Sequence, residues 1–265
     1  MQADAARAVA ADRAPDVAAD RAASSRRDRL RAATSQEIIQ TARRLLIEQG
    51  SAAVSLRAIA REMGMTAPGL YRYFASHETL IQYVVADIFT ELSDHIEAAV
   101  RSALADHAGA ATAESTATGL IVGCRAFRDW AVAHPPEFAM IFGSPLPEME
   151  IGQDDPLTAC GFRFGLIYLR LVTDLWAIRP FSVPADDQID PSLRVQLSRY
   201  ATLPKAGLPL GVLQTFLRCW VLLYGTVSLE VFGHLKFALE DSAPMFELML
   251  TDLASMLGLE YPLPA

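Results

Sequence analysis

Apolar residues recur at intervals of three and four along most of this 265-residue chain. The longest such series comprises Leu80, Ile81, Val84, Val85, Ile88, Leu92, Ile96 and Val100. This spacing places the apolar side chains on one face of an α-helix. No stretch alternates apolar and polar residues, as a half-buried β-strand would, and no internal repeat is present. The sequence therefore predicts an all-α fold.

Capping and stop signals predict where the helices begin and end. Thr34 and Glu37 form the pattern of a capping box at the start of the first helix, and Gly50 supplies its end. Ser76 is expected to cap a long helix that ends near Leu104. Other helices are expected over residues 56–63, 67–73, 114–133, 136–143, 155–177, 190–201, 207–237 and 243–257.

Composition and charge divide the chain into three parts. Residues 1–27 are almost all Ala, Arg, Asp and Ser and cannot form a core, so we expect a disordered tail. Residues 28–83 and 84–265 are expected to form two helical domains. Residues 24–83 carry nine Arg and five acidic residues, whereas the whole chain has a net charge of −8. A basic block on an acidic body suggests contact with a polyanion, although a solvated Arg-rich surface fits the charges equally well.

The stretch from Ser55 to Phe74, SLRAIAREMGMTAPGLYRYF, predicts two short helices joined by a tight turn at Gly64. Such a helix-turn-helix can place its second helix in the major groove of DNA. Leu70 and Phe74 are expected to face the core. The residues left on or beside the outward face are Thr66, Ala67, Pro68, Gly69, Tyr71, Arg72 and Tyr73.

Residues 34–85 closely resemble the DNA-binding domain of the TetR family of one-component transcriptional regulators. The resemblance rests on Gly50, the Ser-x-Arg-x-Ile-Ala run at 55–60, Gly64, the Leu-Tyr-x-Tyr-Phe run at 70–74, and Leu80. It implies a regulator, most simply a repressor that binds an inverted-repeat operator as a homodimer. A DNA-binding protein that acts constitutively, without an effector, is the alternative.

The resemblance implies that several residues contact DNA, and each of them also has an explanation without DNA. Arg57 would reach a guanine edge or a phosphate, or else be solvated. Tyr71 and Tyr73 would hold phosphates, or else fill the core. The family usually has Lys where this chain has His77, and a neutral imidazole adds no full charge there. The expected DNA-binding residues are Ser55, Arg57, Thr66, Ala67, Pro68, Gly69, Tyr71, Arg72, Tyr73 and His77. Arg26, Arg27, Arg29 and Arg31 would form either a flexible basic arm or a solvated tail.

The second domain resembles more loosely an effector domain marked by a Trp-His-Gly pattern. The similar residues are the His-Pro-Pro-Glu-Phe run at 134–138, Ile141 to Gly143, and Trp220 to Gly225, with Tyr224 in place of the expected His. The resemblance implies a cavity for a small apolar effector, since ligand pockets are mainly apolar. The candidate lining residues are Phe127, Trp130, Phe142, Tyr168, Trp176, Trp220 and Tyr224.

Two C-terminal segments predict a surface for self-association. Residues 207–237 are apolar nearly all round, and residues 243–257 carry one apolar stripe, so both need cover. A homodimer through residues 207–257 is expected, and the resemblance implies a four-helix bundle made by both copies. The candidate interface residues are Phe216, Leu217, Val221, Phe246, Met249, Leu250, Leu253 and Leu257.

The sequence lacks the motifs of enzymes, metal-binding proteins, membrane proteins and secreted proteins. The five His show no metal-binding spacing, no nucleophile or phosphate-loop motif is present, and the expected cofactor and metal content is none. Cys124, Cys160 and Cys219 are far apart and are expected to be reduced. No charge-free apolar stretch reaches the ~20 residues that span a bilayer, and the first residues, which include Asp4, Arg7, Asp12 and Arg13, lack the apolar segment of a secretory signal. These features predict a cytoplasmic non-enzyme without a membrane span.

Overall fold

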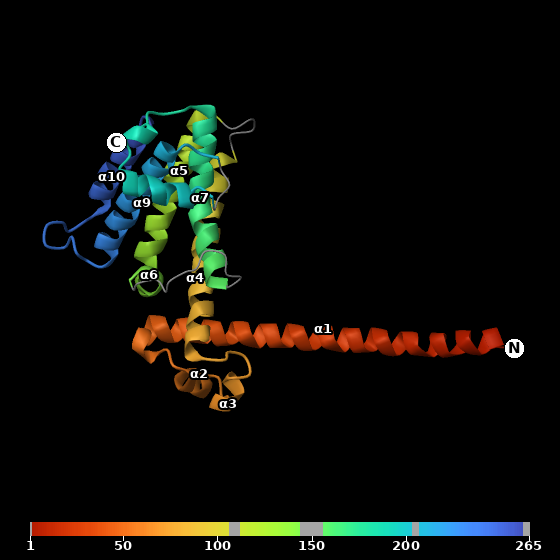
Figure 1. Ribbon diagram of the computed structural model, residues 1–265. Coiled ribbons are helices and arrows are strands. Elements are labelled where there is room, and N and C mark those ends of the chain that lie inside the picture. The colour runs from red at the N-terminus through yellow and green to blue at the C-terminus, as the bar shows by residue number, and fades with distance from the viewer. Residues whose placement is uncertain (1, 106–111, 144–155, 203–206, 262–265) are drawn as a thin grey trace. The chain divides into compact units, whose positions relative to one another are not determined.

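The structure is a computed structural model that describes residues 2–105, 112–143, 156–202 and 207–261, with residues 2–25 and 156 described by their backbone alone (Figure 1). Every regular element in these ranges is a helix, which confirms the predicted all-α class. The chain forms two compact units, residues 1–84 and 85–265, each with its own buried core.

Unit 1 consists of α1 (Gln2–Gln49), a 3-10 turn η1 (Ser51–Ala53), α2 (Leu56–Glu62), α3 (Ala67–Leu70) and the start of α4 (His77–Leu104). The C-terminal half of α1 packs against α2, and α2 packs against α3 (Figure 1). Ile38, Ile59, Leu70 and Leu80 have no exposed surface and form the centre of this core. The apolar positions chosen by helical spacing therefore face inward here.

Two features of α1 differ from the sequence prediction. The helix is continuous from Gln2, whereas a disordered tail was expected over residues 1–27. Ala and Arg are strong helix formers, so this composition favours a helix even though it lacks an apolar face. Arg43 is buried, with only 8% of its surface exposed, although a charged side chain beside the apolar series of a helix is expected to face water.

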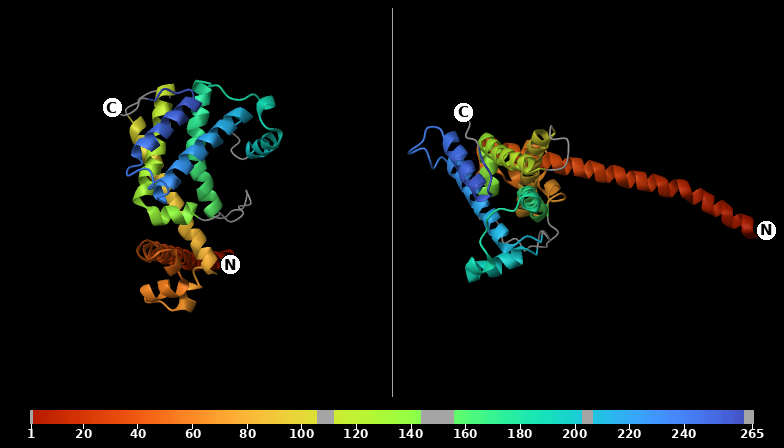
Figure 2. Two further views of the ribbon diagram at one scale, coloured as in Figure 1. Left: turned by 90° about the vertical axis from the view of Figure 1, so that its left-hand side faces the viewer. Right: turned by 90° about the horizontal axis from the view of Figure 1, so that it is seen from above.

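Unit 2 contains the rest of α4 and six further helices. These are α5 (Ala113–Ala133), α6 (Pro135–Phe142), α7 (Pro156–Ile178), α8 (Pro191–Tyr200), α9 (Leu210–Val231) and α10 (Ala243–Met256), with a 3-10 turn η2 (Asp186–Gln188). Helix α5 packs on α6, α7 and α9, and α9 also packs on α8 and α10 (Figure 2). A helix is predicted over residues 207–237, but α9 is shorter. The chain turns at Gly233, whose φ of +71° is left-handed.

Helix α9 is, among the described residues, the one helix with the length and hydropathy to cross a membrane. Helix α9 reaches this length although it contains Arg218, whereas the apolar stretches that are free of charge are shorter. Within unit 2, the buried face of α9 includes Val212, Leu213, Leu223 and Val227, each at most 2% exposed. The core helix of a globular domain has the same composition, so α9 is weak evidence for a membrane span.

Candidate DNA-binding surface and ligand cavity

Backbone and side-chain caps build the helix-turn-helix of unit 1. The Ser55 Oγ accepts a hydrogen bond from the Ala58 N–H at 3.2 Å and begins α2. Gly64, with a left-handed φ of +64°, turns the chain, and the Met65 N–H returns to the Ala60 carbonyl at 2.8 Å. The Thr66 Oγ1 then accepts from the Gly69 N–H at 3.3 Å and begins α3. These bonds fix the two short helices against each other.

The predicted DNA-binding residues lie on or near the surface of this unit. Leu70 and Phe74 are buried as expected, and α3 ends at Leu70 rather than at Tyr73, so residues 71–73 form a turn. Tyr71 is 54% exposed and is therefore no core residue. Exposed side chains belong to Arg57, Thr66, Pro68, Tyr71 and Arg72, whereas Ser55, Ala67, Gly69, Tyr73 and His77 are half-buried.

His77 has a structural contact that the sequence did not indicate. Its ring Nε2 lies 2.7 Å from the backbone oxygen of Val54, in the loop before α2. A carbonyl oxygen can only accept, so Nε2 carries the hydrogen in this pair. In a neutral ring with its hydrogen on Nε2, Nδ1 is an acceptor and cannot donate to a phosphate, as the Lys ammonium implied by the family resemblance would. His77 thus ties the start of α4 to the loop that precedes α2.

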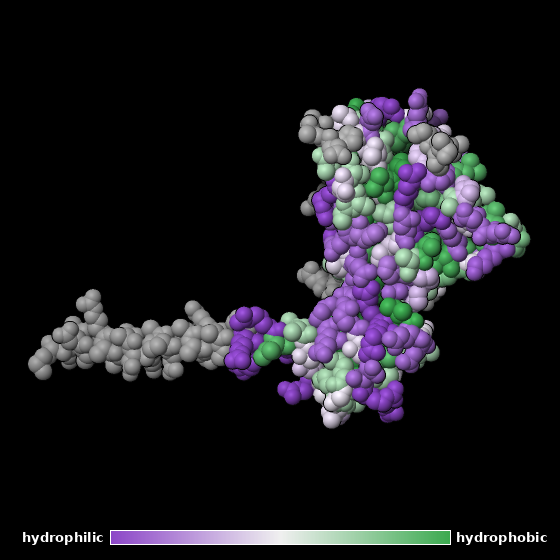
Figure 3. All heavy atoms as spheres, turned by 180° about the vertical axis from the view of Figure 1, so that it is seen from behind, coloured by the Kyte–Doolittle hydropathy of each residue, from purple (hydrophilic) through white to green (hydrophobic). Residues whose placement is uncertain are grey.

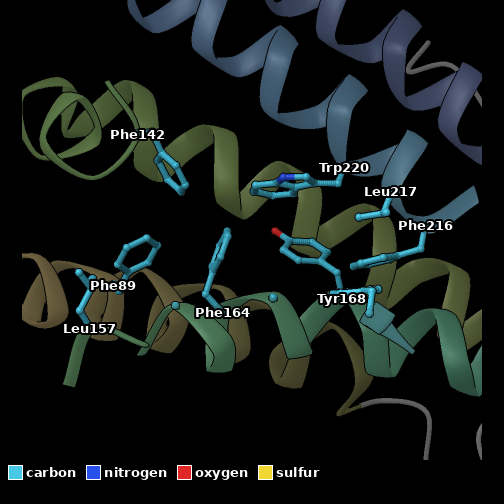
Figure 4. Close-up of a pocket in the computed structure, with 11 residues that line it drawn as sticks. Phe89, Phe142, Leu157, Phe164, Tyr168, Phe216, Leu217 and Trp220 are labelled. Atoms are coloured by element: carbon cyan, nitrogen blue, oxygen red, sulfur yellow. The ribbon is translucent and has the colours of Figure 1, made fainter. Parts of the chain in front are cut away.

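A cavity of about 240 Å³ lies within unit 2, between α4, α6, α7, α8 and α9. In Figure 4, Phe142 and Trp220 approach it from one side, and Phe89, Phe164 and Tyr168 from the other. Its lining is aromatic and aliphatic, with two glycines, and comprises Phe89, Phe142, Leu157, Gly161, Phe164, Gly165, Tyr168, Tyr200, Phe216, Leu217 and Trp220. This composition suits an apolar ligand.

Three of the seven predicted pocket residues, namely Phe142, Tyr168 and Trp220, line this cavity. The other four, Phe127, Trp130, Trp176 and Tyr224, are not in its lining, so their assignment is corrected. Helical spacing identifies apolar faces, and it cannot separate a ring at a cavity wall from one packed behind it.

Contacts elsewhere account for these four residues. Trp130 stacks on His134 at 4.9 Å between ring centroids and donates to Glu91 at 3.1 Å. Trp176 packs against Phe181 at 5.2 Å. Phe127 has no exposed surface and lies behind the lining rings, with its centroid 5.9 Å from that of Trp220. Tyr224 stacks on Trp220 and donates its hydroxyl to the Phe142 carbonyl at 2.9 Å, so it positions both lining residues.

The polar groups at the cavity are two tyrosine hydroxyls and the Trp220 indole. The Tyr168 hydroxyl donates to the Gly123 carbonyl at 2.9 Å, and burial raises the pKa of Tyr168 well above its ordinary value. Burial also raises the pKa of Tyr200, so both phenols are neutral near pH 7. No charged side chain is among the described residues that line the cavity. The cavity is therefore suited to an uncharged molecule.

Two arginines of α5, Arg125 and Arg128, are engaged in ion pairs. Arg128 makes two bonds to the Glu230 carboxylate, at 2.7 and 2.6 Å, and thereby joins α5 to α9. Arg125 binds Glu247 of α10, at 3.1 and 2.9 Å. An Arg and a carboxylate make a strong bidentate pair, so both guanidinium groups are held by carboxylates of neighbouring helices.

Two cavity glycines were not identified from the sequence. Gly161 and Gly165 lie one turn apart on α7, so they share a face of that helix. A Cβ built at either residue meets no heavy atom within 4 Å, which means that open space faces the bare backbone. Two glycines four residues apart in a predicted helix indicate a helix face without side chains, and this spacing could have identified the cavity wall from the sequence.

The apolar stripe of α10 is covered within the subunit, which corrects its assignment to a partner surface. Phe246, Met249, Leu250, Leu253 and Leu257 are each at most 5% exposed, and α10 packs on α9. Phe216 and Leu217 line the cavity instead. A side chain without exposed area has no surface to offer a partner.

Other residues of α9 and α10 are exposed and apolar. Of the predicted interface, Val221 is 66% exposed, and it lies near Leu222, which is 36% exposed. Leu229 on α9 is exposed, as are Met245 and Leu248 on α10. Met245 and Leu248 lie three residues apart and so share one face of α10. The two helices therefore carry apolar side chains outward as well as inward.

Comparisons with known proteins identify the family. Residues 38–84 match bacterial regulatory proteins of the tetR family, and residues 120–253 match the tetracyclin repressor-like C-terminal domain. The chain is 30% identical over 225 residues to the HTH-type transcriptional regulators Rv1816 of Mycobacterium tuberculosis and Mb1846 of Mycobacterium bovis. These alignments cover 77% of this chain and 83% of each relative.

Solved structures share the fold. The regulatory protein SCO4313 superposes with a TM-score of 0.60 at 28% identity, covering 86% of this chain and 98% of that one. A protein of unknown function from Rhodococcus sp. RHA1 superposes with a TM-score of 0.56 at 20% identity, covering 86% and 95%. The helix-turn-helix geometry and the two family matches agree with the resemblance of residues 34–85 to the TetR DNA-binding domain. The chain therefore belongs to the TetR family and is a DNA-binding transcriptional regulator, not an enzyme.

Proposed function

We propose that this regulator is a cytoplasmic repressor that binds an inverted-repeat operator as a homodimer and is released by a small, uncharged, apolar effector. The cavity of about 240 Å³ in unit 2 carries this proposal, because the described residues of its lining are mainly aromatic and none of them is charged. A cavity of this size is slightly below the ~300–1,000 Å³ of typical ligand sites, so it suits a compact molecule.

The exposed apolar residues of α9 and α10 support the homodimer. Val221, Leu229 and Leu248 are 66%, 44% and 51% exposed, so two helices that pack on each other both carry apolar side chains that a second copy could cover. Two copies that meet through α9 and α10 would form a four-helix bundle with two-fold symmetry. A two-fold dimer presents two recognition helices, so it reads an inverted repeat with half-sites ~34–36 Å apart or somewhat more.

Arg57→Ala tests both the base contact and the symmetry of the operator. We expect a loss of ~1–3 kcal/mol in DNA binding, because a bidentate Arg–guanine pair contributes about that much discrimination. Sequences selected from a random DNA pool by the wild type should be inverted repeats. The variant should lose its preference at one base pair in each half-site, symmetrically. An unchanged preference would exclude the base contact, and a single half-site in the selected pool would exclude the symmetric dimer.

Effector release follows from a shift between conformations. Helix α4 contributes residues to both units, so a change in its course within unit 2 can be carried to the helix-turn-helix. A ligand that prefers the conformer with poorly spaced recognition helices draws the population away from DNA. A differential affinity of ~100-fold, about 2.7 kcal/mol, weakens DNA binding by a similar factor.

Filling the cavity from its glycine face tests the ligand site. In Gly161→Ala/Gly165→Ala the two methyl groups enter open space, so they should occupy cavity volume without a clash. Alanine is favoured over glycine in a helix by ~1 kcal/mol per residue, so thermal stability should not fall. We expect the neutral dye N-phenyl-1-naphthylamine to bind the wild type, to change the fluorescence of Trp220, and to bind the variant about tenfold more weakly, a loss of ~1.4 kcal/mol.

Gly225→Ala is the matched control. Gly225 lies in the middle of α9, a Cβ there also meets nothing within 4 Å, and it is not part of the cavity lining. It should gain stability and bind the dye like the wild type. If both variants bind equally, the dye does not use this cavity. If no apolar compound that enters the cavity weakens DNA binding, the constitutive regulator without an effector becomes the better function.

A further inference from the structure

The first described side chains of α1 bring a group of arginines to the helix-turn-helix. Residues 26–31 read Arg-Arg-Asp-Arg-Leu-Arg, and all six are exposed. Figure 3 shows a mainly hydrophilic band at this end of the coloured part of α1. The Arg31 Nη2 donates a hydrogen bond of 2.8 Å to the backbone oxygen of Arg72, just after α3. This bond fixes a basic turn of α1 to the end of the recognition segment.

A groove of about 520 Å³ lies between these two segments, and both of its walls are basic. Arg27 and Arg31 line it from α1, four residues apart and so on one helix face. Arg72 and Tyr73 line it from the turn after α3. Among the described lining residues Asp28 is the single acidic one, so these residues together carry a formal charge of +2. A guanidinium has five N–H donors, and the bond from Arg31 to the Arg72 carbonyl leaves most of them available.

We infer that this groove binds a backbone phosphate of the same DNA duplex that α3 reads. Guanidinium groups match the geometry of phosphate and bind it through two parallel hydrogen bonds. The groove is continuous with the DNA-binding surface, because Arg72 and Tyr73 belong to both. Residues 26–31 are therefore part of the DNA interface and extend it beyond the helix-turn-helix. Contacts of this kind add affinity and fix the register of the protein, but they read no sequence.

The salt dependence of DNA binding tests the inference directly. Binding of Arg27→Ala and of Arg27→Ala/Arg31→Ala is measured at several KCl concentrations, on a duplex selected from a random pool by the wild type. Each lost phosphate contact lowers the slope of log K against log salt by ~0.9. We expect a decrease of ~0.9 per subunit for the double variant, because the groove then loses its phosphate, and a smaller decrease for the single variant, which keeps Arg31. The selected sequence should stay the same for all variants.

Two further variants separate the groove from general charge effects. Arg101→Ala removes a 70% exposed positive charge from unit 2 and should leave the slope unchanged. Arg27→Lys keeps the charge in the groove and should restore most of the slope. Arg27→Ala leaves the bond from Arg31 to Arg72 in place, so its effect does not depend on that structural contact. The inference is overturned if Arg27→Ala shows the slope of Arg101→Ala. Selection of a DNA sequence by the wild type tests sequence-specific binding by the helix-turn-helix, so a failure of the proposed function can be distinguished from a failure of this inference.

Discussion

Replacing Leu70 by alanine is expected to abolish specific DNA binding while the cavity of unit 2 still binds its ligand. Leu70 ends the four-residue α3 and has no exposed surface. Leu→Ala in a core costs ~2–5 kcal/mol, which is a large part of the stability of a small domain. A helix this short cannot persist without packing, so losing its one buried side chain should release the recognition segment.

The measurements are fluorescence anisotropy with the selected duplex and titration with N-phenyl-1-naphthylamine. Ile47→Ala is the control within the same unit, since Ile47 is 51% exposed and a surface substitution usually changes stability by less than ~0.5 kcal/mol. DNA affinity equal to that of the wild type in Leu70→Ala would show that α3 holds its place without this anchor. Loss of dye binding together with DNA binding would show that the two cores do not fold separately.

Local signals were sufficient to predict most of the fold. Residues 56–63 and 114–133 were expected to be helical, and the structure has α2 at Leu56–Glu62 and α5 at Ala113–Ala133. Ser55 and Thr66 cap helix starts, whereas Thr34 and Glu37, which predict a capping box, lie inside α1, and the Thr34 hydroxyl donates to the Leu30 carbonyl at 3.0 Å instead. One predicted helix end is wrong although the residue that sets it, Gly233, is local. Helix α9 ends at Val231 because of the turn that follows, although the apolar residues continue to Phe237.

The two candidate sites differ in how far apart in the sequence their residues lie. The helix-turn-helix is built from twenty consecutive residues, so its exposed and buried faces could be read from spacing. The cavity combines residues from five helices, from Phe89 to Trp220, and no local pattern shows which aromatic rings meet there. The stripe of α10 was identified correctly as apolar, but spacing does not say whether the same chain or a second copy covers it. Here α9 covers it, as Leu250 with no exposed surface demonstrates.

Phe127→Ala is expected to have the largest effect in unit 2. Phe127 has no exposed surface, and its ring centroid lies 5.9 Å from that of Phe142, 5.8 Å from Phe164 and 5.9 Å from Trp220. Those three rings line the cavity, so Phe127 supports the lining from behind. Phe→Ala in a core costs ~3–5 kcal/mol through lost burial and the void left behind. The melting temperature of unit 2 should therefore fall by many degrees.

The void left by Phe127→Ala lies directly behind the lining rings, and this position gives a second expected result. Removal of the ring should let Phe142, Phe164 or Trp220 relax into the space, so the cavity should accept ligands larger than the wild type accepts. A bound ligand stabilises the folded form by mass action, by ~2.7 kcal/mol at a hundred times its Kd, and should recover much of the lost stability. Phe237→Ala is the control, because Phe237 is 89% exposed and its loss should change stability by less than ~0.5 kcal/mol. A melting temperature for Phe127→Ala close to that of Phe237→Ala would mean that the aromatic cluster is not the core of the ligand domain, and the cavity would then lose its structural support as an effector site.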